Sequence, residues 1–524
     1  SPRPASQRAA AFILTAAMLI TLAAPAFAET WYIENGDITV KASDTGNDVT
    51  QKDKTTYGDK DTIITNRKED ASSNTVTIEA KDKDDKVEVT LKDVNIDTSS
   101  RNKAAVSVTG EGDTNIKLNG DNALKSDIYR SGIYGSGSGS LTISGGENDS
   151  LTAQGGAGGS GIHISRNGSL TISGGTVTAN GDDGGRGISS SGSVIISGGS
   201  TVTANGGSGT ISGGDGIWSG GGVTISGGST VTANGGNGGS LVGGDGIRSG
   251  GGLTVSDGTV TAKGGNGDSK DGYGGDGIRS GGGVTISGNT VNAAGGNGGK
   301  VGGYGICSFD RVAISGGTVE AAGGNGSTGG GSGIYSSVID LSGSLELTAK
   351  AGSPNGKALS QKGSELDLNA IKDKLGPGAK VTATDADGKV IDQVSTPRPV
   401  EPEESSSSSD GGSATPSAPA SPLPGLTVTD KDGQRISYTS TQSGNTLTVC
   451  VGRLTASFRI SLAALRQLRA EGIEAITFQT ILCSTTLSLD ELLAMGGEDA
   501  EVVLTHHIRS STLTVGGKDV CKDV

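Results

Sequence analysis

The sequence predicts an all-β protein whose central part is a parallel β-helix with three short strands per coil. The dipeptide Gly-Ile recurs with its isoleucine at positions 133, 162, 188, 217, 247, 278, 306 and 334, a period of about 29 residues. Each repeat holds three short alternating runs such as "GIWS", "VTISGG" and "TVTAN", which is the pattern of half-buried strands. No proline, which would remove a ladder hydrogen bond, occurs between Pro25 and Pro354.

Stacking explains why such repeats fold at all. A single repeat cannot bury its inward face, whereas stacked repeats bury a continuous apolar shaft. In one repeat we expect Val223, Ile225, Val231 and Ala233 to point inward. We expect the glycines at the corners to allow left-handed turns.

Residues 1–28 have the pattern of an export signal. Arg3 and Arg8 precede an apolar run that ends at the small-residue site Ala26-Phe27-Ala28. The mature chain is therefore expected to begin near Glu29 and to be secreted, extracellular or associated with the cell surface. After removal of the signal we expect no insertion into a membrane, because no later apolar run has the length of a span.

The next two segments form the predicted β-helix. Residues 29–130 are more charged and are interpreted as an N-terminal cap with irregular first coils, and 131–394 as the glycine-rich repeats with a C-terminal cap. In the repeats, the distance from the glycine corner that follows the third run to the next Gly-Ile isoleucine varies from 7 to 14 residues, while the rest of the coil is nearly constant. A solenoid that collects its insertions at one corner usually has its working face there.

A linker and a small domain complete the chain. Residues 395–425 contain seven of the twelve prolines among many serines and are predicted to be extended and disordered. Residues 426–524 are interpreted as a small α+β domain, with strands at 447–451 and 474–478 and a helix between them that begins at the N-cap Ser461 and stops at Gly472.

The overall composition excludes several classes. A net charge of −14 argues against a nucleic-acid partner, and 32% hydrophobic residues with 94 glycines argue against one large globular core. The four cysteines, Cys307, Cys450, Cys483 and Cys521, are too few for a disulfide scaffold. Their pairing and the oligomeric state stay open.

One column of the array carries carboxylates. Asp215, Asp245 and Asp276 each lie two residues before a Gly-Ile isoleucine, so they stack in consecutive coils about 4.8 Å apart. Neighbouring charges at this spacing repel and need a cation. Calcium is the sharper hypothesis for that cation, and Arg186 is a candidate at one end of the column. The alternative is that the three aspartates are simply hydrated in exposed turns.

A second column begins one residue after each isoleucine and points outward. It gathers aromatic and basic side chains in a chain with only 3% aromatic residues. Aromatic faces stack on sugar rings, and arginines form forked hydrogen bonds with carboxylates, so we interpret the column as a carbohydrate-binding strip. The alternative is surface decoration, with the arginines merely pairing with the aspartates across a rung. The strip consists of Tyr134, His163, Trp218, Arg248, Arg279 and Tyr335.

The motifs "VEVTLKDVNIDT" and "AAVSV", followed by repeats of the type "GGDGIRSGGGVTISGNTV", resemble the secreted carbohydrate-binding β-helix proteins of clostridia and related anaerobes. The resemblance covers roughly residues 87–350. It implies a right-handed parallel β-helix related to the pectate-lyase fold, calcium sites, and binding of plant cell-wall polysaccharides such as cellulose or pectin-like polygalacturonate.

The sequence therefore predicts a secreted, non-catalytic polysaccharide-binding protein that depends on calcium. A calcium-dependent polysaccharide lyase is one alternative, but it needs a positioned base. Lys263, Lys270 and Lys300 lie near the variable corner without stacking against the aspartates, so no catalytic residue is assigned. A passive adhesin or stalk without a glycan site is the other alternative.

Overall fold

The computed structural model describes residues 29–397 and, with short gaps, 425–520. The predicted signal, residues 1–28, and most of the predicted linker lie outside the described residues. The chain divides into two compact units, 1–402 and 403–524. Within the described part of the chain, no helix is long and apolar enough to cross a membrane.

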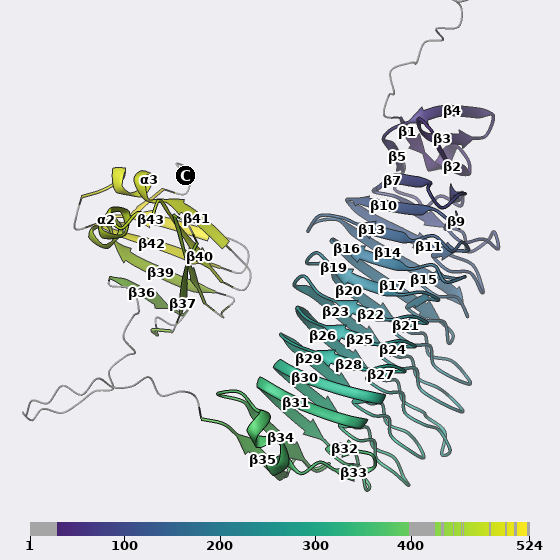
Figure 1. Ribbon diagram of the computed structural model, residues 1–524. Helices are drawn as coiled ribbons and strands as arrows, with labels where there is room; N and C mark the ends of the chain where they lie inside the picture. The colour runs from purple at the N-terminus through teal and green to yellow at the C-terminus, as the bar shows by residue number, and fades with distance from the viewer. Residues whose placement is uncertain are drawn as a thin grey trace, which may run out of the picture. The chain divides into compact units, whose positions relative to one another are not determined.

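The first unit is the predicted parallel β-helix, a solenoid of about 13 turns whose coils are stacked one on another in Figure 1. The first strand of each coil pairs in parallel with the first strand of the next. The strands of this first file are β2 (Ile38–Ser43), β6 (Val76–Ala80), β9 (Val106–Gly110), β12 (Ile133–Gly135), β15 (Ile162–Ile164), β18 (Ile188–Ser190), β21 (Ile217–Ser219), β24 (Ile247–Ser249), β27 (Ile278–Ser280) and β32 (Leu359–Gln361).

The second and third files are built in the same way. The second file consists of β1 (Thr30–Tyr32), β5 (Thr62–Thr65), β7 (Lys86–Lys92), β10 (Asp113–Asn119), β13 (Leu141–Ser144), β16 (Leu170–Ser173), β19 (Val194–Ser197), β22 (Val223–Ile225), β25 (Leu253–Val255) and β28 (Val284–Ile286). The third consists of β8 (Asn95–Asp97), β11 (Asp121–Lys125), β14 (Ser150–Ala157), β17 (Thr176–Asp182), β20 (Thr201–Asn205), β23 (Ser229–Asn234), β26 (Gly258–Lys263), β29 (Thr290–Ala294) and β34 (Lys380–Thr384). Two long strands, β30 (Ile306–Ala322) and β31 (Ile334–Lys350), bend through all three files.

The interior is the continuous aliphatic shaft that the alternation predicts. Ile217, Val223, Ile225, Val231 and Ala233 of one coil are all buried, and their equivalents above and below are buried as well. Burying each branched side chain contributes about 1.5–3 kcal/mol, so every coil stabilises its neighbours.

Antiparallel strands close both ends of the shaft and keep its edges from pairing with other chains. At the N-terminal end, β3 and β4 fold back on β2, and at the C-terminal end β33 pairs with β32 and β35 with β34. The capping elements are β3 (Gly46–Gln51), β4 (Lys54–Asp59), β33 (Ser364–Glu365), β35 (Val390–Ser395) and two 3-10 helices, η1 (Ile33–Asn35) and η2 (Leu368–Lys374).

The described residues of the second unit form two sheets and two helices. The expected N-cap is confirmed, because the Ser461 side chain accepts a hydrogen bond from the Ala464 amide and the helix runs to Ala470. The second helix, with Ser488 as its N-cap, was not predicted. The elements are β36 (Leu426–Thr429), β37 (Thr439–Ser443), β38 (Thr446–Cys450), β39 (Ala456–Ser461), α2 (Leu462–Ala470), β40 (Ala475–Gln479), β41 (Ser484–Ser488), α3 (Leu489–Ala494), β42 (Glu501–His506), β43 (Ser511–Val515) and β44 (Lys518–Asp519).

The cysteines are divided between the two units. Cys307 and Cys450 are free thiols, and Cys483 and Cys521 lie outside the described residues. Cys307 is buried, and burial raises the pKa of its thiol to about 12, so it stays protonated at neutral pH.

The necks of the variable loops are joined by a ladder of glycine amides. The Gly236 N–H donates to the Gly214 carbonyl of the preceding coil at 2.8 Å, and the Gly244 N–H donates to the Gly236 carbonyl at 2.8 Å. The same alternation continues through the whole array. This glycine ladder consists of Gly185, Gly207, Gly214, Gly236, Gly244, Gly265, Gly275, Gly296, Gly303, Gly324, Gly331 and Gly352.

Steric crowding, rather than turn geometry, explains these glycines. At the corner between the second and third files, Gly227 and Gly228 do have positive φ angles of 62° and 71°, as expected. At the loop necks the expectation was wrong, because Gly214 and Gly244 are not in the left-handed region. A Cβ on Gly244 would instead lie 1.9 Å from the Gly214 carbonyl oxygen, which no side chain tolerates.

We therefore expect Gly244→Ala to destabilise the solenoid by about 3 kcal/mol, because the new methyl group must push two coils apart and break a ladder bond. Urea unfolding followed by circular dichroism measures this loss. Gly283→Ala is the matched control, since its Cβ would meet its nearest atom at 3.5 Å, an ordinary contact. Equal stability of the two variants would contradict the steric explanation.

Candidate functional site

The predicted outward column is brought together by the register of the first file. Tyr134 lies opposite His163, Trp218 opposite Arg248, and Arg248 opposite Arg279. Tyr335 lies opposite Cys307, at the far end of the column. The stacking of consecutive coils that the sequence predicts is thus confirmed, although Ser189 and Cys307 are buried and interrupt the exposed strip.

A groove runs along this file, between the outward strand residues and the necks of the variable loops. Its first part has a volume of about 570 Å³ and lies over β6, β9, β12 and β15. Its second part has a volume of about 630 Å³ and extends to Arg248 and Arg279. The two parts share Gly158, Ser160 and His163, so the groove is continuous from coil to coil.

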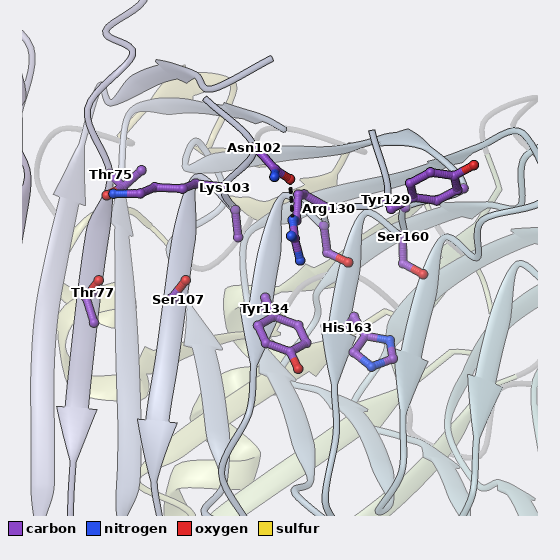
Figure 2. A pocket seen from close by; sticks show the side chains of 14 residues that line it. Thr75, Thr77, Asn102, Lys103, Ser107, Tyr129, Arg130, Tyr134, Ser160 and His163 are labelled. Carbon is purple, nitrogen blue, oxygen red and sulfur yellow. Dashed lines mark hydrogen bonds between the residues drawn. The ribbon is translucent and has the colours of Figure 1, made fainter. Parts of the chain in front are cut away.

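Aromatic rings form part of the floor of the groove. In Figure 2, Tyr134 and His163 project side by side from neighbouring strands, with Arg130 beside them. The two rings are stacked with centroids 5.6 Å apart. Burial, followed by the charge of Arg186, lowers the pKa of His163, so the ring is neutral at neutral pH and offers an aromatic face rather than a charge.

Trp218 is the next aromatic residue of the column; it does not line the groove itself but lies opposite Arg248, which does. The Arg186 guanidinium lies 4.5 Å from the centre of the Trp218 ring, a cation–π distance. The same guanidinium donates through Nε to Asp215 Oδ2 at 3.2 Å. Arg186 is therefore held in place by one ring and one carboxylate, and it fixes the orientation of Trp218 in turn.

The aspartate column is buried, with exposed fractions of 6%, 5% and 1% for Asp215, Asp245 and Asp276, and its first two members line the second part of the groove. One oxygen of each carboxylate accepts the backbone N–H of the next coil. Asp215 Oδ1 accepts from the Asp245 amide at 2.8 Å, Asp245 Oδ1 from the Asp276 amide at 2.7 Å, and Asp276 Oδ1 from the Tyr304 amide at 2.7 Å. The carboxylates act as side-chain rungs between coils.

Arginines hold the other carboxylate oxygens. Arg279 Nε lies 2.8 Å from Asp276 Oδ2 and 3.3 Å from Asp245 Oδ2. Burial opposes the charge of Arg279, but these two carboxylates outweigh it and raise its pKa. The alternative pairing across a rung is therefore correct for Arg279. In the described part of the chain Arg248 has no ion-pair partner and is exposed at the groove.

The surroundings of the aspartates do not fit a calcium ion. Calcium takes six to eight oxygen ligands, whereas these oxygens are already bonded to amides and guanidinium groups. Among the described residues, no group of three or more His, Cys, Asp or Glu side chains is arranged to hold a metal. Calcium binding by Asp215, Asp245 and Asp276 stays a prediction.

Sequence reasoning missed the residues that line the first part of the groove. Lys103 comes from an early coil without the Gly-Ile motif, and Arg130 donates through Nε to Asn102 Oδ1 at 3.0 Å. The sequence did contain a sign of these groove residues, because Tyr129 and Arg130 occupy the two positions that later repeats fill with Gly-Gly. Tyr304, which stacks on Tyr335 with centroids 5.0 Å apart, was also missed as an aromatic partner.

Comparison with protein-family models, with curated proteins and with solved structures finds no match to this chain. The β-solenoid fold is therefore established by the structure, and the likeness to clostridial carbohydrate-binding proteins rests on the quoted motifs alone.

The buried aspartate column is expected to make the stability of the solenoid depend on pH. Burial, and then the charge of Asp276, raise the pKa of Asp245 from its ordinary value of 3.8 to about 7. A group whose pKa is raised by folding binds protons better in the folded state, so the wild type loses stability as the pH rises from about 4 to about 7. Asp245→Asn keeps an oxygen for the Asp276 amide and removes the charge.

We expect Asp245→Asn to be more stable than wild type at pH 8, by about 1–3 kcal/mol, and to have no advantage at pH 4. Urea unfolding at both pH values measures the difference. Asp268→Asn, at an exposed position on a variable loop, is the control and is expected to match wild type at both. A variant that is equally stable or weaker at pH 8 would show that the Asp245 charge is fully compensated.

Proposed function

We propose that this protein binds an extended polysaccharide chain, of the plant cell-wall type, along the groove of the first strand file, without cleaving it. The observation that carries the proposal is the continuity of the groove over successive coils with aromatic rings in its floor. From β6 to β27 the groove crosses seven inter-strand steps. At about 4.8 Å a step it is roughly 34 Å long, room for several sugar units.

The chemistry of the floor suits sugar rings. The exposed ring of Tyr134 inside the groove, and the half-buried ring of Trp218 next to the groove residue Arg248, offer apolar faces for C–H groups. The glycine necks leave the backbone uncovered on the other wall, so a ligand can approach main-chain polar groups closely.

The charge balance of the groove favours a polymer that carries carboxylates, such as a pectin-like chain, over neutral cellulose. The chain as a whole has a net charge of −14, yet both parts of the groove hold a cation without an ion-pair partner among the described residues, Arg130 in the first and Arg248 in the second. A guanidinium forms paired hydrogen bonds with a carboxylate. Export to the cell exterior, from the predicted signal, would place the groove where such polymers occur.

We expect Arg248→Ala to weaken binding to polygalacturonate about tenfold, a loss of about 1.4 kcal/mol, because one charge-assisted contact disappears. Trp218→Ala is expected to weaken binding to both polygalacturonate and insoluble cellulose. Pull-down and isothermal calorimetry measure these changes. Lys263→Ala, which removes an exposed cation from the third file, is the matched control.

Two further arms separate the alternatives. Binding that is unchanged in chelator would remove the predicted calcium dependence. Accumulation of unsaturated product, followed by its ultraviolet absorbance, would indicate a lyase instead. Equal retention of wild type, Trp218→Ala and Arg248→Ala on every polysaccharide would contradict the groove and favour a passive stalk.

A further inference from the structure

The N-terminal cap contains a buried carboxylate without a cation. Asp59, at the end of β4, is only 1% exposed. Its Oδ2 accepts hydrogen bonds from Trp31 Nε1 at 3.3 Å and Thr62 Oγ1 at 3.0 Å, and its Oδ1 accepts from the amides of Asp61 at 3.2 Å and Glu29 at 3.3 Å. All four donors are neutral, and no ion pair among the described residues includes Asp59. A buried carboxylate in this state is costly, because it has lost water without gaining an opposite charge.

One of these donors stands at the predicted signal junction. The bond between Ala28 and Glu29 is the expected cleavage site, and the Glu29 nitrogen already faces Asp59. The Glu29 side chain is anchored independently, because Thr56 Oγ1 donates to its Oε2 at 2.7 Å and Lys54 forms an ion pair with its Oε1. Burial opposes ionisation of Glu29, but these partners outweigh it and hold its pKa below the usual value.

We propose that removal of the signal at the Ala28–Glu29 bond creates the missing counter-ion, and that the new α-ammonium of Glu29 binds the buried carboxylate of Asp59. A signal peptidase supplies the reaction, in which water adds across the amide. The hydroxyl goes to the Ala28 carbonyl carbon and a proton to the Glu29 nitrogen, giving a free carboxyl group and an amine. An α-amino group has an ordinary pKa of about 7.7–8.0, so the amine takes up a further proton at neutral pH.

The consequence is that the processed cap is more stable than the unprocessed one. The amide of the precursor donates one neutral hydrogen bond to Asp59, whereas the ammonium donates a charge-assisted one from the same atom, without any movement of the chain. The gain in stability concerns the end of the apolar shaft. Trp31, which donates to Asp59, is only 3% exposed, and the nearby Ile33 is fully buried. Cleavage therefore stabilises the first coil against opening.

The experiment compares two full chains, 29–524 and 28–524, which differ by one retained alanine. Each is made with Asp59 and with Asp59→Asn, in a Trp218→Phe background that leaves Trp31 as the single tryptophan of the chain. Its indole donates to Asp59, so its fluorescence follows the cap directly. Urea titration of this signal gives the opening equilibrium of the cap.

We expect the equilibrium constant for opening of the cap to be about tenfold lower in the chain that begins at Glu29 than in the chain that begins at Ala28, because a charge-assisted bond replaces a neutral one. Asp59→Asn is expected to abolish most of this difference, so that the caps of the two chains open to nearly the same extent. Asp61→Asn, exposed in the same turn, is the control and is expected to preserve the difference. Raising the pH above about 8 to 9 deprotonates the amine and is expected to reduce the advantage.

Two results would overturn the proposal. One is equal opening of the chains that begin at Glu29 and Ala28, which would show that the charge adds nothing. The other is mass spectrometry of the exported protein that finds its first residue elsewhere than Glu29. If Asp59→Asn prevents folding, N-acetylation of the chain that begins at Glu29 removes the positive charge instead. An acetylated chain whose cap is as stable as that of the free amine would also overturn the proposal.

Discussion

The close approach of successive coils at the glycine ladder is the constraint on which the rest of the molecule depends. Loops of unequal length leave the solenoid at one corner, yet their necks stay in register because glycine amides bond directly from coil to coil. A single Cβ at Gly244 would meet a carbonyl oxygen at 1.9 Å, so the ladder exists only because side chains are absent. The fixed necks form one wall of the groove, and outward side chains of the first strand file form part of its floor.

The charged residues of the groove divide into two roles. Asp215, Asp245 and Asp276 are buried rungs, and each accepts the amide of the next coil, so they support the architecture. Arg186 and Arg279 neutralise part of that buried charge. Arg248 forms no ion pair among the described residues and is exposed at the groove; burial raises the pKa of Asp276, and the charges of Arg279 and, to a smaller extent, Arg248 oppose this rise. Identical positions in consecutive coils thus serve different purposes.

The repeat period was enough to predict the fold and the files of stacked residues, because strand register in a solenoid follows directly from equivalent positions in the repeat. Trp218 beside Arg248 could be foreseen for this reason. The contacts of Arg186 with both Trp218 and Asp215 could not, since they depend on side-chain conformation across coils. The first part of the groove was missed because its coils lack the Gly-Ile signature, and the glycine necks were explained wrongly because sequence does not reveal interatomic crowding.

The identical register of neighbouring coils also affects how the number of coils can change in evolution. Residues of β21 pair with β24 as those of β24 pair with β27, position by position. Because contacts reach only adjacent coils, loss or duplication of one coding unit would join matching surfaces and leave the shaft intact. Recombination between near-identical gene segments can therefore lengthen or shorten the molecule in whole steps, with each copy free to acquire its own outward side chain.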